Sequence, residues 1–427
     1  MPETSLPLTR HDSPLHSDVL IVGGGPAGLS LATSLAQFGL QATVLELQTA
    51  AQLADPAPDG REIALTHPSV ALLQRLGSWQ RLAEHEVGVL RQAEVHDGPV
   101  GHSPSMALHA GGTGVAQLGF IVPNSALRRS AYETAARTAG VRIITEAKVL
   151  RASTYATHAE VEYQDASAPG LPPQVLQAPL LVAADSRFSG VRRQLGIGAA
   201  MTDFGRTVIV CRMHHELPHH ETAHECFGYE RTLAILPLPN DWIDGQPQCS
   251  AVITASAEQA QALLALAPED FAASVQAQFG HRLGAMALTG ERHAYPLVAV
   301  YAHRFSGARC ALLGDAAVGM HPVTAHGYNL GLAGVQSLSE VLYAAWSHGQ
   351  DIGAASVLQP YANAHHRHAW PLYQGTNAIV RLYTDTRPLP RLLRQAVLAG
   401  SRRLPPLQAL IVSQLTGRRP AWPRVGG

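Results

Sequence analysis

The 427-residue sequence predicts an α/β protein with a Rossmann-type dinucleotide-binding domain, a second domain built on an antiparallel sheet, and a C-terminal helical segment. Three observations support this prediction. A short apolar stretch runs into a glycine-rich turn near the N-terminus, residues 207–257 alternate between apolar and polar side chains, and a strand-like stretch near residue 310 returns to the pattern of the first domain. The length also exceeds what one ordinary core needs.

The first element is a predicted strand–helix–strand unit. Residues 18–22 are apolar enough for a short buried strand, and the glycines after them open a helix from about Pro26 to Phe38, which Gly39 ends. A second strand is expected over residues 42–47 and carries Glu46. This order and spacing is typical of the unit that binds dinucleotides.

The turn itself holds three glycines in GxGxxG register, at Gly23, Gly25 and Gly28, with Pro26 and Ala27 between the last two. The first glycine permits the tight turn, the second lets a pyrophosphate approach the backbone, and the third allows the helix to pack closely. Glu46 follows at the distance where a carboxylate can accept both hydroxyls of an adenosine ribose. The motif indicates a dinucleotide without choosing between NAD and FAD.

The later elements complete two domains. Further strands are expected over residues 141–144 and 180–184, the antiparallel sheet over residues 207–257, and two helices over residues 258–279. The strand near residue 310 then makes the first domain discontinuous, and the chain after Pro360 is helical and rich in arginine. We found no internal repeat.

Composition excludes several classes of protein. The formal net charge of −1 argues against nucleic-acid binding, and 46% hydrophobic with 15% charged residues argues against disorder. No apolar stretch reaches the roughly 18 residues that span a bilayer, and no export signal is expected at the N-terminus. We therefore predict a cytoplasmic protein whose membrane contact, if any, is peripheral at the inner face.

Cysteine and histidine patterns do not predict a metal site. The four cysteines lack CxxC spacing, which argues against both a zinc site and a disulfide framework: Cys211, Cys226, Cys249 and Cys310. Histidines gather in two places, but with 22 in the chain such gatherings are expected on a surface: His214, His215, His219, His220 and His224, and the run from His365 to His368. We predict no metal ion.

A second chemical segment runs from Leu312 to Leu332, LLGDAAVGMHPVTAHGYNLGL. Asp315 follows the predicted strand and could bind a polyol hydroxyl. A helix from about Asn329 would direct its free N–H groups and positive end at an anionic ring, such as a reduced flavin. The alternative is an ordinary strand–loop–helix crossover.

Four segments together resemble the FAD fingerprints of the aromatic-ring flavoprotein hydroxylases. They are GGGPAGLSLA, DGREIAL, VAADSRFSGVRR and GDAAVGMHPVTAHGYNLGL, in the family's order and spacing. Within that family the chain is similar to the ubiquinone-biosynthesis hydroxylases, whose pattern of an HP pair, a glycine and NLGL recurs at His321, Pro322, Gly327 and residues 329–332. The likeness covers nearly all of residues 18–350 and is greatest to the branch of 5-demethoxyubiquinol hydroxylases.

The resemblance implies a fold of the p-hydroxybenzoate hydroxylase type and FAD as the cofactor. It places the pyrophosphate at residues 23–28, the adenosine ribose at Glu46 and the ribityl chain at Asp315. It also places Arg61 and Arg128 near the phosphates and the ribityl chain. It implies an FAD-binding domain over residues 1–190 and 291–350, a substrate domain over residues 191–290, and the helical, arginine-rich segment over residues 351–427.

Two parts of the pattern depart from the family. The middle fingerprint usually has Asp-Gly where this chain has Asp185 and Ser186, which puts nicotinamide binding in doubt. His326 stands where the related enzymes commonly carry glutamine. It either hydrogen-bonds the flavin or substrate, or merely caps backbone.

The loop and helix start beside the flavin would contribute further groups. The resemblance implies that Pro322 shapes the wall of the site, with Pro322 and His326 as the catalytic candidates. The start of the following helix would bind the cofactor through Gly327, Asn329 and Leu330.

The function implied is hydroxylation of an aromatic ring in a ubiquinone-biosynthesis intermediate. NAD(P)H or another donor would reduce FAD, oxygen would add at flavin C4a, and the resulting hydroperoxide would attack the ring. Because no second GxGxxG unit is present, NAD(P)H would dock only transiently. The alternatives are a hydroxylase of another phenol and a catalytically silent FAD-bound scaffold in a ubiquinone-synthesis complex. A halogenase is disfavoured because its WxWxIP segment and lysine near the flavin are missing.

The substrate is expected to be an isoprenylated quinone-type molecule, in an apolar pocket near residues 236–238. Residues 381–427 hold nine arginines and one acidic residue, Asp385. Such a segment could lie on an anionic membrane surface or pack on the enzyme as a helix pair with a solvated basic face.

Overall fold

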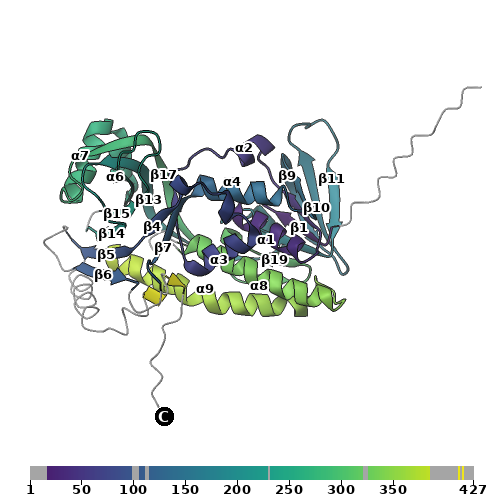
Figure 1. Cartoon of the computed structure of the whole chain (residues 1–427). Helices are drawn as coiled ribbons and strands as arrows, with labels where there is room; N and C mark the ends of the chain where they lie inside the picture. Colours follow the sequence, from purple (N-terminus) through teal and green to yellow (C-terminus); the bar gives the residue numbers. More distant parts are fainter. Residues whose placement is uncertain are drawn as a thin grey trace, which may run out of the picture.

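The computed structural model describes residues 17–98, 105–110, 115–228, 231–320, 326–384, 412–413 and 416–417. Two lobes lie side by side: a parallel sheet with its helices at one end and a large sheet with α6 and α7 at the other (Figure 1). The two long helices α8 and α9 run along one side of the parallel sheet (Figure 1). Within the described ranges, every helix is too short or too polar to span a bilayer.

The parallel sheet confirms the predicted Rossmann-type unit. Its order is β18-β19-β12-β1-β2-β8, and all neighbours pair in parallel except β18 with β19. The central strands are buried on both faces, which explains their unbroken apolar sequences. The strands are β1 (Val19–Val22), β2 (Ala42–Leu45), β8 (Val141–Ile144), β12 (Leu180–Ala183), β18 (Ser306–Gly307) and β19 (Cys310–Leu312).

Helices cover this sheet and set the position of its loops. Helix α1 contacts both α4 and α8, and α9 packs along α8. The predicted C-terminal helix begins earlier than expected, at Ala355, so that Pro360 lies inside α9. The helices of this lobe are α1 (Pro26–Gln37), α2 (Ala50–Ala54), α3 (His67–Leu76), α4 (Asn124–Ala135), α5 (Gly190–Gln194), α8 (Gly327–Ser347) and α9 (Ala355–Thr384).

Two small antiparallel sheets flank the first lobe. One has the order β3-β7-β4 and lies toward the large sheet, and the other has the order β11-β10-β9. Their strands are β3 (Glu62–Leu65), β4 (Gly88–Leu90), β7 (Gly119–Pro123), β9 (Ala147–Thr154), β10 (Ala159–Asp165) and β11 (Gln174–Ala178).

The large sheet confirms the predicted antiparallel second domain but draws on more of the chain. Its order is β20-β17-β13-β16-β15-β14-β5-β6. Strands β5 and β6 come from residues 92–109, within the range 1–190 that was assigned to the first domain, and β5 pairs with β14 in parallel. The domain boundaries therefore stay a proposal. The strands are β5 (Gln92–Asp97), β6 (Ser105–His109), β13 (Ala199–His215), β14 (Thr222–Phe227), β15 (Thr232–Pro237), β16 (Gln248–Ser256), β17 (Met286–Ala302) and β20 (Val318–Gly319).

The two faces of the large sheet bury different cores. Helices α6 (Ala257–Ala265) and α7 (Pro268–Gln278) cover one face, with Ile253 and Phe271 in that core. The other face contributes to a separate apolar cluster together with β4, β6 and β7. We call this the inter-lobe apolar cluster; its buried members are Leu90, Met106, Leu108, Ala110, Leu118, Ile121, Leu238 and Val412.

Candidate active site and its cofactor cradle

The glycine-rich turn after β1 is shaped to accept a phosphate group. A Cβ on Gly23 would overlap the backbone of Ala184, and one on Gly28 would overlap the carbonyl oxygen of Gly23. A Cβ on Gly25 would meet no atom of the described residues within 4 Å. The N-terminus of α1, which begins at Pro26 and Ala27, thus faces open space, where its unpaired N–H groups and positive end favour an anion.

The carboxyl end of β2 brings two predicted cofactor residues together. One Glu46 oxygen accepts the Gly24 N–H at 2.6 Å, and the other accepts the Gln48 N–H at 2.9 Å. Arg128, on α4, donates to the side-chain oxygen of Gln48 at 2.7 Å. Gln48 therefore joins Glu46 and Arg128 through hydrogen bonds beside the glycine turn, and their contacts with a dinucleotide stay a prediction.

A residue that was not predicted from the sequence links the middle fingerprint to Ala316, the residue after Asp315. The Asp185 carboxylate accepts the Ser189 hydroxyl at 2.5 Å and so closes the turn before α5. Arg192, only 3% exposed, donates to the carbonyl oxygen of Ala316 at 2.9 Å. Its position in VAADSRFSGVRR gives no hint of this contact, because the partner is a backbone group more than a hundred residues away.

The start of α8 meets the start of α1 beside Asp315. A Cβ on Gly314 would lie 3.3 Å from the Ala27 side chain, and one on Gly331 would lie 3.7 Å from Gly314. The Asp315 side chain, 41% exposed, is paired with Arg187 at 3.2 Å. A Cβ on Gly327, in the first turn of α8, would meet no described atom within 4 Å. Two helix N-termini and one carboxylate therefore border the same open region.

The remaining predicted residues at the start of α8 turn inward. The Asn329 side chain accepts the Thr66 N–H at 2.9 Å and donates to the carbonyl oxygen of Ala64 at 2.8 Å, and Leu330 is buried. Asn329 thus fastens the link between β3 and α3 to α8. Any effect of Asn329 or Leu330 on a bound cofactor would be exerted through this packing.

His326 immediately precedes α8, and its carbonyl oxygen accepts the Leu330 N–H at 2.8 Å. Its side chain makes no cap hydrogen bond to the helix. Contact of this side chain with flavin or substrate stays a prediction. Pro322 and His321 lie outside the described residues.

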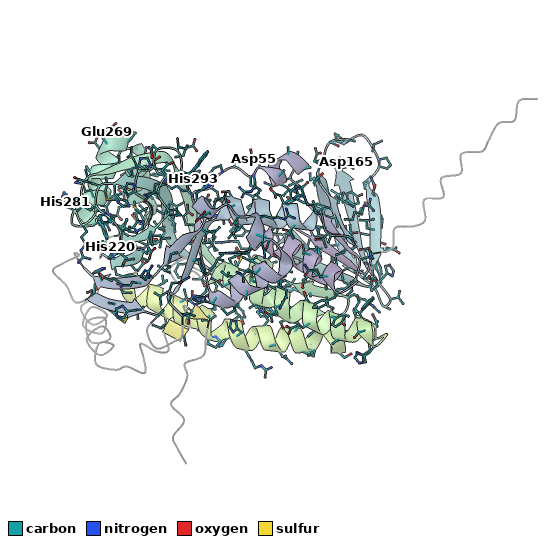
Figure 2. All side chains as sticks on the ribbon, viewed as in Figure 1. Asp55, Asp165, His220, Glu269, His281 and His293 are labelled. Carbon is teal, nitrogen blue, oxygen red and sulfur yellow. The ribbon has the colours of Figure 1, made fainter. Side chains whose placement is uncertain are left out.

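A cavity of about 350 Å³ opens where β3 and the start of α4 face the large sheet. Arg61 lies here, paired with Asp59 at 2.5 Å and placed over the ring of Tyr295. His293 lines the cavity from β17, between the two lobes (Figure 2). The structure therefore places Arg61 at the junction of the lobes, in contact with residues of the large sheet.

The cavity also holds an ion pair with a buried carboxylate, which the sequence did not reveal. Glu62 is 1% exposed, and one of its oxygens accepts both Nε and Nη2 of Arg212, at 2.9 and 2.8 Å. The other oxygen has no hydrogen-bond partner among the described residues. Burial raises the pKa of Glu62 to about 7, although Arg212 opposes the shift.

A second buried carboxyl lies on the inter-lobe side of the large sheet. Glu225, on β14, is flanked by Val95 of β5 and Ala234 of β15. Paired residues point to the same face, and Val95 packs against the inter-lobe apolar cluster, as do Ala223 and Leu236. Burial raises the pKa of Glu225 to about 8. A carboxyl group therefore lies beside the inter-lobe apolar cluster, and the predicted apolar pocket near residues 236–238 stays a prediction.

This cluster lies next to the open region at the start of α8. Ala64 packs against the inter-lobe apolar cluster, and its carbonyl oxygen accepts the Asn329 side chain. Residues 412–413 and 416–417 are the described part of the arginine-rich C-terminal segment. There Val412 is buried in the cluster, and a Cβ on Gly417 would touch Pro68. This part of the segment packs on the enzyme.

Comparison with known proteins agrees with this geometry. Residues 16–376 match the family described as "FAD binding domain". Ubiquinone hydroxylase UbiM of Neisseria meningitidis is 46% identical over 406 residues, which cover 94% of this chain and 85% of that protein. The chain belongs to the FAD-dependent ubiquinone hydroxylases.

A second ubiquinone hydroxylase and two solved structures have lower sequence identity to this chain. Ubiquinone hydroxylase UbiL of Rhodospirillum rubrum is 32% identical, with 94% of this chain and 90% of that protein covered. The crystal structure of p-nitrophenol 4-monooxygenase PnpA of Pseudomonas putida has a TM-score of 0.74 at 18% identity, covering 95% of this chain and 99% of that chain. The brominase Bmp2 reaches 0.72 at 14% identity, so the structural likeness shows the fold alone.

The cradle of this hydroxylase fits FAD. The glycine turn would take the pyrophosphate, Glu46 would hold the adenosine ribose, and Asp315 with the two helix N-termini would border the flavin. FAD, once bound, supplies redox chemistry and the activation of oxygen, which no amino-acid side chain provides. The chain's own residues must bind and orient the substrate and keep water away from the reacting atoms.

Glu62 gives the hydroxylase a testable dependence of stability on pH. Its pKa is higher in the folded chain than in the unfolded chain, so the folded state is favoured while Glu62 is protonated and loses that advantage as pH rises through about 7. From about pH 5 to about pH 8 the wild type should lose up to about 3 kcal/mol of unfolding free energy relative to Glu62→Gln.

Chemical denaturation at the two pH values measures this difference. The variant Glu258→Gln, at an exposed position on α6, is the control and should differ from wild type by the same amount at both. If the stability difference between Glu62→Gln and wild type did not change with pH, Glu62 would not titrate in this range.

Proposed function

We propose that this protein hydroxylates the aromatic ring of an isoprenylated, quinone-type intermediate of ubiquinone synthesis. The observation that carries the proposal is the 46% identity to a ubiquinone hydroxylase over 94% of this chain. The inter-lobe apolar cluster supports it, because an aromatic ring that carries an isoprenoid chain needs an apolar and dry site next to the flavin. NAD(P)H or another donor would reduce the flavin in a transient encounter.

The protein's own groups would then prepare the ring. The Glu225 carboxyl group lies in the apolar cluster, where it can hydrogen-bond a ring hydroxyl and take its proton when ionised. A partly deprotonated phenol is the more nucleophilic ring. His326 and Pro322 would complete the wall on the side of α8. Arg61, at the cavity between the lobes, would lie near the cofactor's phosphates and ribityl chain, as would Arg128.

The remaining cofactor assignments belong to the same proposal. Gly23, Gly25, Gly28, Pro26 and Ala27 would contact the pyrophosphate. Glu46 would bind the adenosine ribose and Asp315 the ribityl chain. Asp185, which closes its own turn, would act on FAD by shaping the backbone beside Gly23.

Membrane contact and a multi-enzyme complex are further parts of this proposal. An isoprenylated substrate partitions into lipid, and the basic C-terminal segment could bring the enzyme to an anionic surface, each basic side chain there contributing about 1 kcal/mol. The packing of Val412 and Gly417 limits this role to other parts of the segment.

The substrate is tested by quinone profiling in a deletion strain. The mutant should accumulate a ubiquinone precursor that lacks one ring hydroxyl group, and the wild-type gene should remove it. A normal quinone profile in the deletion strain would contradict the proposal and favour a hydroxylase of another phenol. A profile restored by a variant that does not turn over substrate would favour the silent scaffold.

The role of Glu225 is tested with the purified enzyme. Because a general base contributes about 100-fold or more, Glu225→Gln should lower kcat/KM by at least that factor while FAD stays bound. The exposed Glu258→Gln should leave kcat/KM unchanged. The pH profile of kcat/KM should lose its ascending limb near pH 8 in Glu225→Gln. An unchanged profile and rate would remove Glu225 from the reaction.

A further inference from the structure

A triad of metal-ligand side chains lies on the opposite face of the same strands. Glu94 and His96 are two residues apart on β5 and so point to one face, and His224 joins them from β14. Cys226, two residues after His224, lies in the core under α7, which identifies this as the helix-covered face. The triad is therefore separated from the inter-lobe apolar cluster by the sheet itself.

The side chains of the triad differ in their exposure to solvent. The His96 side chain is 1% exposed, whereas Glu94 is 26% exposed. The ring of Phe279, just after α7, packs edge-on against His224. His220 and His281 lie on this lobe as well (Figure 2). The triad thus has a closed inner side and a side open to water.

The distances within the triad match one face of a tetrahedron around a zinc ion. His96 Nε2 lies 3.3 Å from His224 Nδ1 and 3.3 Å from Glu94 Oε2, and His224 Nδ1 lies 3.6 Å from the same oxygen. Ligand atoms about 2.0 to 2.1 Å from a tetrahedral Zn²⁺ lie roughly 3.3 to 3.4 Å apart. All three atoms therefore converge on a point that an ion could occupy without rearrangement of the strands.

We propose that this triad binds a divalent transition-metal ion of the zinc type. Glu94 Oε2, His96 Nε2 and His224 Nδ1 are the protein ligands, and water takes the fourth position on the open side. Two imidazoles and one carboxylate are a common ligand set for zinc with an open position. The ion binds both β5 and β14 and so cross-links these two strands of the large sheet at their parallel pairing.

The cross-link has a structural consequence for the active site. Strands β5 and β6 reach the large sheet from residues 92–109, and β5 joins it through β14. The opposite face of these strands carries Val95 and Glu225, next to the proposed substrate pocket. A metal ion on the helix-covered face would hold β5 and β14 in the register that places Glu225 on the face toward the other lobe.

Arg282 would compete with a metal ion for the Glu94 carboxylate. It approaches Glu94 Oε2 to 3.4 Å from the turn after α7, and its side chain is partly exposed. In the rival arrangement Arg282 and the two histidines form only a hydrogen-bond network around Glu94. The two arrangements differ in their response to Arg282→Gln. Loss of this cation favours metal binding in the first and removes a stabilising contact in the second.

Cobalt titration of the full-length, FAD-bound protein tests the proposal. After removal of metals by a chelator, Co²⁺ should develop the intense visible bands of tetrahedral coordination, and Zn²⁺ should displace it and raise Tm. His96→Gln and His224→Gln should each weaken Co²⁺ binding by at least about 100-fold, more than the loss of an outer hydrogen bond costs. Arg282→Gln should bind Co²⁺ at least as tightly as wild type.

The matched control is His214→Gln, because His214 belongs to the second group of potential ligands among the described residues, with Asp241 and Asp244. It should leave the cobalt spectrum unchanged. Loss of the bands in this variant, or their persistence in both triad variants, would overturn the proposal. If a triad variant fails to fold, the wild-type and Arg282→Gln spectra decide, and a wild type without tetrahedral bands refutes the site.

Discussion

The close approach of α1 and α8 at Gly314 is the constraint on which the site depends. Only small side chains allow the two helices to meet, since Ala27 and Gly331 both lie against Gly314. This contact brings two positive helix ends to one open region, beside the carboxylate of Asp315. The buried Arg192 side chain stabilises the same region by donating a hydrogen bond to the carbonyl oxygen of Ala316. The cradle is thus formed by backbone geometry before any cofactor contact is made.

In the second lobe, the two faces of strand β14 carry different functional groups. Along β14, successive side chains point to opposite faces, so His224 faces the helices and Glu225 faces the other lobe. The first face carries the triad and the second carries a carboxyl in the inter-lobe apolar cluster. One short strand therefore links the proposed metal site to the proposed substrate pocket.

Local patterns in the sequence predicted the cradle well. The strand, the glycine turn and Glu46 are close in sequence, so the geometry of Gly23, Gly25 and Gly28 followed from spacing alone. The predicted antiparallel sheet was also confirmed. These features depend on neighbours within about thirty residues, which is the range over which periodicity and turn chemistry act.

Long-range contacts were not predictable in this way. The Glu62 side chain lies in an ordinary strand sequence, and only Arg212, 150 residues away, makes it a buried ion pair. The parallel pairing of β5 with β14 creates both the Glu94 triad and the surroundings of Glu225, and no local pattern signals it. The histidine-rich sequence near His224 was interpreted as a surface cluster because its partners on β5 are far away in sequence.

By the proposed function, this FAD-dependent hydroxylase inserts one atom of molecular oxygen into a quinone-type ring. The most direct measurement supplies the purified FAD-bound enzyme with an electron donor, the precursor that accumulates in the deletion strain, and isotopically labelled oxygen gas. Mass spectrometry should find the label in the new ring hydroxyl group, with one product formed per donor oxidised. Product whose new oxygen comes from water, or donor oxidation that yields only peroxide, would contradict the account.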